Sequence, residues 1–196
     1  MFGESMDVKR FLILMLFVGV INNTALAQID PAAAGDSIAV QKTAGDDYAP
    51  DLVFLPGYDQ INSFKQLKEK LKGTPVFIDL WASWCGPCRK EFYYKDSLTT
   101  FLKEQGVQML YISMDDNGQE DQWKRLLKYF KVGGLHMRAN NALQYDLSRV
   151  IWKQNGGFSI PRYVLLDQNG VVLNSKMLRP GDRGLLYRQI KTLLGR

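Results

Sequence analysis

Two cysteines, Cys85 and Cys88, are the only ones in the 196-residue sequence, and they stand two residues apart. A disulfide between them would close a very small loop, and a small loop contributes little stability in the chain-entropy view. An exported domain held together by disulfides would usually carry several scattered cysteines. The spacing therefore indicates a redox-active pair, able to form and break a disulfide by thiol exchange.

The residues around the pair predict different roles for the two thiols. Cys85 follows an apolar run at residues 75–81 and precedes a helical pattern, so its sulfur is predicted at a helix N-terminus. Free N–H groups and the helix dipole stabilise a thiolate there and lower its pKa below the usual ~8.5. Cys88 lies on the same helical face within disulfide reach, which makes Cys85 the attacking thiol and Cys88 the resolving one. Pro87 fits the first helical turn, and Gly86 lets a second polypeptide approach closely.

Asp79 interrupts the otherwise apolar run at residues 75–81. Strand alternation places its side chain on the opposite face from Ile78 and Leu80. A carboxyl group buried there would have a raised pKa, and perturbed acids cluster beside reactive groups. We predict that Asp79 accepts and donates a proton for Cys88 during exchange. The alternative is a carboxylate at the frayed end of the strand, facing water.

The elements that must position these residues follow from the apolar spacing. A capping box at residues 63–66 begins a helix that Gly73 stops, Asp182 is predicted to cap the last helix, and Asn169-Gly170 is typical of a hairpin. Strands are predicted at residues 75–81, 107–113, 163–166 and 171–173. The helical stripes are Phe64, Leu67 and Leu71; Phe92, Leu98, Phe101 and Leu102; Trp123, Leu126, Leu127 and Phe130; Leu143, Leu147, Val150 and Ile151; and Leu186, Ile190, Leu193 and Leu194. This order predicts an α/β domain with a central mixed β-sheet flanked by helices.

Residues 1–27 have the layout of a signal peptide. Lys9 and Arg10 precede the apolar run Phe11–Ile21, and an Ala-Leu-Ala triplet predicts cleavage after Ala27. A buried N-terminal helix and a membrane span are the alternatives, but the run would rise only about 16 Å as a helix, roughly half of a ~30 Å hydrocarbon core. Residues 28–48 have the composition of a linker, and residues 49–196 are predicted to form the packed domain, soluble outside the cytoplasm.

The composition argues against other classes of function. The formal net charge is +5, but the basic residues are scattered, which disfavours a nucleic-acid partner. One cysteine pair and His136, the only histidine, do not supply the four ligands of a structural zinc site. Covalent haem attachment needs histidine directly after the second cysteine, where Arg89 stands. We expect no metal or organic cofactor, and we predict that His136 is a loop or strand residue.

The segment FIDLWASWCGPCRKEF resembles the active-site segment of the thioredoxin superfamily, and with the export signal it is similar to the TlpA/ResA-like thiol–disulfide oxidoreductases. YAPDLVF resembles that family's entry strand, YISMDD its second core strand, and SIPRYVLLDQNGVV its cis-proline segment and hairpin, so the resemblance covers roughly residues 48–195. It implies a thioredoxin-like fold with an extra N-terminal strand segment and a helical insertion before the cis-proline. It also implies that Cys85 is the nucleophile, Cys88 the resolving cysteine and Asp79 the buried acid beneath them.

The resemblance further implies a surface for substrate. Pro161 matches the proline that is cis in the family and packs opposite the disulfide, and Ile160 would present backbone for substrate pairing. The sequence alone would not indicate this, because few X–Pro bonds are cis. Trp84 matches the tryptophan that borders the thiol on the docking surface, whereas Trp81 is predicted to belong to the core.

One departure from the family pattern concerns the helix after the cysteines. Relatives commonly have a proline there that kinks the helix, whereas here Glu91 is followed by residues 92–94, Phe-Tyr-Tyr, which leaves the kink open. Some relatives use a glutamate in place of the strand acid, so Glu91 is a second candidate. The alternative for Glu91 is a solvated acid in the first helical turn, favoured by the dipole.

Together these inferences predict an exported protein-disulfide reductase. The Gly-Pro dipeptide resembles that of reducing thioredoxins, near −270 mV, rather than that of DsbA, near −120 mV. An oxidase or isomerase of the same fold and a thioredoxin-like binding domain with little turnover are the alternatives. The resemblance implies protein thiol or disulfide substrates, apocytochrome c among the candidates, and a membrane thiol donor. We expect a periplasmic monomer with no nucleic-acid partner.

Overall fold

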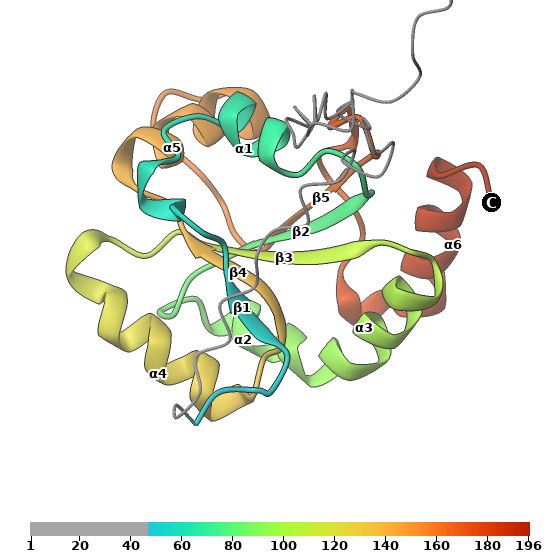
Figure 1. The fold of residues 1–196 in the computed structure, drawn as a ribbon, viewed down its shortest axis with the longest axis horizontal. Coiled ribbons are helices and arrows are strands. Elements are labelled where there is room, and N and C mark those ends of the chain that lie inside the picture. Colours follow the sequence, from blue (N-terminus) through green and yellow to red (C-terminus); the bar gives the residue numbers. More distant parts are fainter. Residues whose placement is uncertain (1–46) are drawn as a thin grey trace, which may run out of the picture. The chain divides into compact units, whose positions relative to one another are not determined.

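The computed structural model describes residues 47–196, which are drawn in colour in Figure 1. The predicted signal peptide, its cleavage after Ala27 and most of the predicted linker lie outside the described residues. Within residues 47–196, no helix is long and apolar enough to cross a membrane.

A six-stranded mixed sheet forms the centre of the described unit, in the order β1-β4-β3-β2-β5-β6. The neighbours from β1 to β2 pair in parallel, whereas β5 is antiparallel to β2 and β6 is antiparallel to β5. This arrangement confirms the predicted mixed sheet and the extra N-terminal strand segment, which is β1 at one edge. The strands are β1 (Leu52–Phe54), β2 (Val76–Trp81), β3 (Gln108–Ser113), β4 (Gly134–Arg138), β5 (Arg162–Leu166) and β6 (Val172–Asn174).

Helices cover both faces of this sheet. Figure 1 shows α1 and α5 on one side and α2, α3 and α4 on the other. The last helix, α6, packs on α3, where the rings of Phe101 and Tyr187 stack with centroids 4.1 Å apart. The helices are α1 (Phe64–Lys70), α2 (Gly86–Glu91), α3 (Lys95–Glu104), α4 (Glu120–Phe130), α5 (Asn141–Leu147) and α6 (Gly184–Leu193).

Local sequence signals set several of these boundaries as predicted. Ser63 caps α1 by accepting a hydrogen bond from the Gln66 N–H at 3.2 Å. The hairpin between β5 and β6 turns at Gly170, whose φ of 76° is a conformation that glycine adopts without strain. Within that turn, Asp167 accepts hydrogen bonds from the backbone N–H groups of Asn169 and Val171.

Two sequence-based predictions near helix ends are wrong. Val150 was predicted on a buried helical stripe, but it is 37% exposed because α5 passes into a π-helical turn at Ser148–Trp152 and the face rotates. Asp182 does not cap α6: its carboxylate accepts from the Arg179 N–H, and Arg183, with φ 46°, precedes the helix instead.

The helix predicted from the stripe of Phe92, Leu98, Phe101 and Leu102 is interrupted without a proline. A 3-10 turn at Phe92–Tyr94 separates α2 from α3. At this turn the ring of Phe92 is buried against three aromatic rings, those of Trp81, Tyr111 and Phe130, with centroids 4.9 to 6.0 Å away. The helix is therefore interrupted here although the proline of the family pattern is missing. The interruption lies where Phe92 packs against the sheet.

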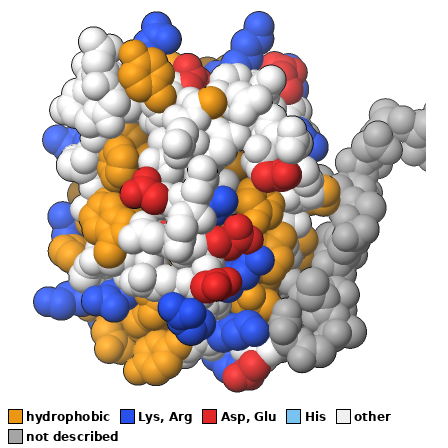
Figure 2. Space-filling model, turned by 90° about the vertical axis from the view of Figure 1, so that its left-hand side faces the viewer, with side chains coloured by type: hydrophobic (Ala, Val, Ile, Leu, Met, Phe, Trp, Pro, Cys, Tyr) orange, Lys and Arg blue, Asp and Glu red, His pale blue; other side chains and the backbone are white. Residues whose placement is uncertain are grey.

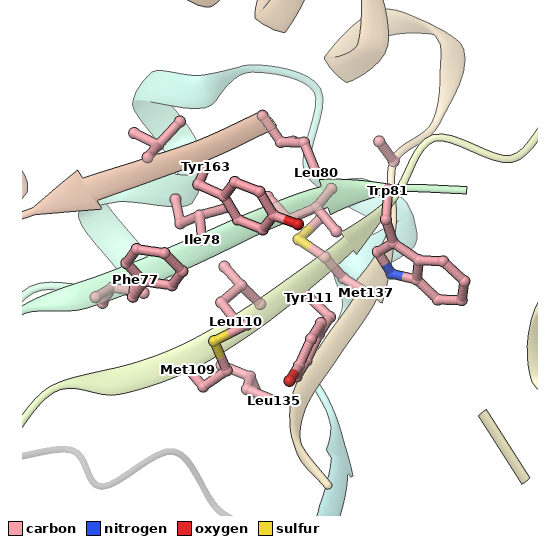
Figure 3. Close-up of a cluster of buried hydrophobic side chains, with 14 of the residues drawn as sticks. Phe77, Ile78, Leu80, Trp81, Met109, Leu110, Tyr111, Leu135, Met137 and Tyr163 are labelled. Atoms are coloured by element: carbon pink, nitrogen blue, oxygen red, sulfur yellow. The ribbon is translucent and has the colours of Figure 1, made fainter. Parts of the chain in front are cut away.

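Large apolar side chains from the strands fill the space between sheet and helices (Figure 3). Phe77 on β2 stacks on Tyr163 of β5 at 5.8 Å, and the two rings lie on the face that carries Asp79. Trp81 is fully buried, as predicted. Trp123 and Leu127 of α4 are fully buried too, which confirms that this stripe is a helix face packed on the sheet.

His136 belongs to β4 and is completely buried, which confirms the prediction of a strand residue. Its ring stacks on Tyr111 with centroids 4.7 Å apart, and its Nε2 lies 3.1 Å from the Gly133 carbonyl oxygen. Burial lowers the pKa of His136 to about 4, so the ring is neutral at physiological pH. A neutral imidazole enclosed in the sheet has a structural role.

Candidate active site

The two cysteines meet in a disulfide where β2 leads into α2. Their sulfur atoms are 2.05 Å apart and their Cα atoms 5.3 Å apart. Cys85 occupies the N-cap position of α2, and its Sγ accepts a hydrogen bond from the Cys88 N–H at 3.2 Å. Pro87 lies in the first turn, where its missing N–H costs no hydrogen bond. The backbone thus offers a donor to the sulfur on which a thiolate would form.

The two thiols differ little in exposure, and their neighbours are more accessible. Cys88 is 1% exposed and Cys85 is 4% exposed, so neither sulfur is freely open to solvent. Trp84, in contrast, is 50% exposed. Gly86 is half-buried and Pro87 is exposed. An accessible indole ring and an accessible turn therefore lie beside Cys85, while the exposure of the two cysteines does not distinguish their roles.

Asp79 lies in the middle of β2, opposite Tyr111 on one neighbouring strand and Tyr163 on the other. It is 2% exposed, and its Oδ1 has no hydrogen-bond partner among the described residues. Burial, and to a smaller extent the charge of Glu91, raises the pKa of Asp79 well above its usual value. The alternative of a water-facing carboxylate at a frayed strand end is therefore wrong.

The sheet face that carries Asp79 is the face that the helix of Cys88 covers. Alternation along β2 puts Asp79 on the same side as Trp81, and Trp81 contacts Phe92 directly after α2. Tyr111, which is paired with Asp79 across the strands, also contacts Phe92. The acid and the second cysteine therefore lie on facing elements, as proton transfer between them would require.

The buried acid predicts an unusual dependence of stability on pH. Because the folded-state pKa of Asp79 is raised, the stability that this group contributes is fully present below its unfolded pKa of about 3.9 and is lost as pH rises through the folded value. The disulfide form of Asp79→Asn is therefore expected to be more stable than the wild type at pH 8, with the difference shrinking toward pH 4. Urea unfolding across this range measures it.

A matched control for that experiment is Asp121→Asn, which removes an exposed carboxylate in the first turn of α4. Its stability difference from the wild type should not follow the same course with pH. A stability difference between Asp79→Asn and wild type that stays constant from pH 4 to pH 8 would show that Asp79 is not a buried acid of raised pKa.

Glu91 is not the solvated first-turn acid that the sequence suggested. It is the last residue of α2, half-buried, and its Oε2 accepts a hydrogen bond from the Gly181 N–H at 2.8 Å. A Cβ at position 181 would lie 3.2 Å from that oxygen, so the approach is close. Glu91 therefore ties α2 to the segment before α6, and its charge reaches Asp79.

The Ile160–Pro161 peptide bond is cis, as the resemblance implied. Arg162, the next residue, pairs with Leu80 near the end of β2, so Pro161 lies beside the point where β2 leaves the sheet toward the cysteines. Ile160 and Pro161 are both half-buried. The residues predicted to form a substrate surface thus come from two segments that meet at one end of the sheet.

A buried polar network beneath the cysteine loop escaped the sequence analysis. The Asp115 carboxylate accepts hydrogen bonds from the Ser83 N–H, from the Ser83 hydroxyl at 2.5 Å and from the Ser113 hydroxyl at 2.6 Å. All three residues are completely buried. Ser83 lies two residues before Cys85, so the network fixes the start of the cysteine loop to the end of β3. An aspartate directly after an apolar strand was the only signal available.

The surface around the cysteines is formed by exposed residues, among them Trp84 and Pro87. A cavity of about 790 Å³ lies elsewhere, lined by residues such as Thr74, Thr99 and Gln108, and contains none of the predicted site residues. Figure 2 views the molecule from the side at which β2 runs into α2, and hydrophobic side chains lie there in separate patches among charged ones. In residues 47–196, no group of three or more His, Cys, Asp or Glu side chains could hold a metal ion.

The chain is similar in sequence to solved structures and to curated proteins. The chain is 25% identical to a thiol:disulfide interchange protein from Bacteroides sp. solved in solution, with a TM-score of 0.50 over 66% of this chain and 78% of that one. It is 30% identical over 108 residues to the thiol-disulfide oxidoreductase ResA of Bacillus thuringiensis subsp. konkukian, and 38% identical over 47 residues to ResA of Bacillus subtilis. The match to the Bacillus thuringiensis protein covers 55% of this chain.

The matches to curated relatives are partial in length. The chain spans 57% of the length of the Bacillus thuringiensis protein and 26% of that of the Bacillus subtilis protein. The redoxin family, in contrast, matches residues 43–182, which include both cysteines, Asp79 and Pro161. The fold is thioredoxin-like, as predicted, and the chain belongs to the redoxin family, with ResA-type thiol–disulfide oxidoreductases among its relatives.

Proposed function

We propose that this protein is a thiol–disulfide oxidoreductase that reduces disulfides in other proteins. The observation that carries the proposal is the Cys85–Cys88 disulfide at the start of α2, with the Cys88 N–H donating to Cys85 Sγ and the buried Asp79 on the facing strand. The names of the ResA relatives support the same chemistry. The exposed residues Trp84 and Pro87 beside the pair would be accessible to a substrate as large as a protein.

In the proposed reaction the reduced protein transfers two electrons to its substrate. The Cys85 thiolate attacks one sulfur of the substrate disulfide, so that a mixed disulfide forms and the first substrate thiolate leaves. Asp79 then takes the proton of the Cys88 thiol, and the Cys88 thiolate attacks Cys85 Sγ. The second substrate thiolate leaves, and the protein ends as the Cys85–Cys88 disulfide with a protonated Asp79. A raised pKa suits an acid that must hold this proton.

The surroundings of the pair suggest how substrate is held and how the cycle closes. We propose that Trp84, Gly86 and Pro87 contact the substrate on one side, and that Ile160 and Pro161 contact it on the other. No metal or organic cofactor takes part in the proposed cycle. The disulfide must be reduced again, and we propose a membrane thiol donor for this step. Apocytochrome c is a candidate substrate by analogy with the family.

The proposed location is outside the cytoplasm, in the periplasm. The support is the basic pair Lys9 and Arg10, the apolar run Phe11–Ile21 and the small residues that end at Ala27. An oxidising compartment would return the pair to the disulfide, which is why a reductase there needs a thiol donor.

The midpoint potential of the Cys85–Cys88 couple tests the direction of exchange. We expect a value below about −220 mV when the full chain is equilibrated in dithiothreitol and glutathione buffers, together with reduction of insulin disulfides by the reduced protein. A potential between about −180 and −120 mV would instead indicate an oxidase or isomerase. A pair that cannot be cycled would favour a binding domain that has kept the fold.

A further inference from the structure

The segment that leads into the cis-proline is held by side chains of the π-helical turn Ser148–Trp152. Residues 153–157 are exposed and have no regular secondary structure. The indole N–H of Trp152 donates to the Ser159 carbonyl oxygen at 2.9 Å. The Ser148 hydroxyl lies 2.7 Å from the Gly157 carbonyl oxygen and 3.1 Å from that of Gln154. Since a hydroxyl has one proton to donate, the shorter contact to Gly157 is the stronger one.

Trp152 contacts the chain on both sides of the Ile160–Pro161 bond. Its ring lies 5.8 Å from that of Phe158, and the Arg162 guanidinium carbon lies 5.6 Å from its centroid. Trp152 is 9% exposed, and its N–H bond to Ser159 is part-buried. One buried indole thus fixes the residues before and after the cis bond.

This use of an indole N–H is selective among the buried tryptophans. The Nε1 groups of Trp81 and Trp123 have no hydrogen-bond partner in the described part of the chain. Trp152 follows Ser148 by four residues, a spacing that places both side chains on one side of the turn. Turns of the π type are rare and occur frequently at functional sites. The insertion before the cis-proline therefore supplies two hydrogen-bond donors, the Trp152 indole N–H and the Ser148 hydroxyl, to the loop that leads to Pro161.

We propose that Trp152 and Ser148 are positioning residues that hold residues 157–161 in place to receive a protein substrate. The inference rests on the proposed function and deepens it, because it assigns part of the discrimination between protein and small disulfides to this turn. A protein substrate would use the backbone edge beside Pro161 as well as the cysteines. A small disulfide reaches Cys85 without that edge. Loosening the loop should therefore weaken the binding of protein substrates and leave the exchange chemistry unchanged.

The test compares Trp152→Phe with the wild-type full chain in two assays. The reduced proteins reduce insulin, a protein disulfide, and 5,5′-dithiobis(2-nitrobenzoate), a small one. We expect KM for insulin to rise about five-fold, the factor that corresponds to loss of one hydrogen bond, with kcat within about two-fold of wild type. The rate with the small disulfide should stay within about two-fold.

Trp123→Phe is the matched control, because it removes the same atoms from a buried tryptophan whose Nε1 has no partner in residues 47–196. It should leave the ratio of the two activities at the wild-type value. Ser148→Ala removes only a hydroxyl, tests the second donor without disturbing an aromatic ring, and should raise KM for insulin in the same direction. An unchanged KM in Trp152→Phe and Ser148→Ala, or equal losses in both assays, would overturn the proposal.

The same assays separate failure of this inference from failure of the proposed function. A wild-type protein that reduces neither disulfide contradicts the proposed function, and the positioning role falls with it. A wild-type protein that reduces both, with variants that keep its KM for insulin, leaves the proposed function standing and contradicts the role of the turn alone.

Discussion

Replacing Cys85 with serine is expected to reduce insulin-disulfide reduction to the uncatalysed rate. Serine lacks the thiolate that attacks the substrate, and Cys88, at 1% exposed, has almost no accessible surface with which to replace it. Removal of a covalent nucleophile commonly costs several orders of magnitude in rate, so no residual turnover should be measurable. The readout is insulin reduction by the variant under the conditions used for the wild type.

Cys88→Ser is the matched control, because the proposed order of attack predicts a different failure. Cys85 can still attack the substrate, but nothing resolves the mixed disulfide, so a covalent adduct with the substrate should accumulate. Mass spectrometry without reductant detects the adduct in Cys88→Ser and should find none in Cys85→Ser. If the adduct forms in Cys85→Ser instead, the assigned roles of the two cysteines are reversed. Retained partner binding with no turnover in wild type would favour the binding-domain alternative.

Much of the site could be predicted because its signals are local. The position of Cys85 at a helix start follows from an apolar strand, a proline and a helical pattern in adjacent residues. The burial of Asp79 follows from the period of two along a strand whose other residues are apolar. The cis bond before Pro161 came from the family resemblance and not from the residues themselves, since an X–Pro sequence does not reveal its isomer.

The remainder depends on partners far apart in the chain. Asp115 and Ser83 are separated by 32 residues, and only the pairing of β2 with β3 brings them together. Strand β4 was not predicted. Its five residues include His136 and end in an arginine, so they form neither a clear apolar–polar alternation nor a continuous apolar run. The π-helical turn cannot be read from its apolar stripe, because Val150 fits a helical period that the backbone does not follow.

Asp115→Ala should be among the most destabilising single substitutions in this protein. The carboxylate is completely buried, and its removal leaves the Ser83 N–H, the Ser83 hydroxyl and the Ser113 hydroxyl without their acceptor. An unsatisfied buried donor costs about 1–3 kcal/mol, so the free energy of unfolding should fall by about 3 kcal/mol or more. Urea unfolding of the oxidised full chain measures this as a lower midpoint.

The control for this loss is Asp121→Ala, which removes an exposed carboxylate and should cost less than about 1 kcal/mol. Asp115→Asn keeps an oxygen for the Ser83 N–H and should fall between the two alanine variants. A loss in Asp115→Ala no larger than in Asp121→Ala would mean that the network does not hold the cysteine loop. A large loss would instead support the network as the anchor that ties the start of the cysteine loop to the end of β3. Ser83, which donates to Asp115, directly precedes Trp84 and Cys85 in the chain.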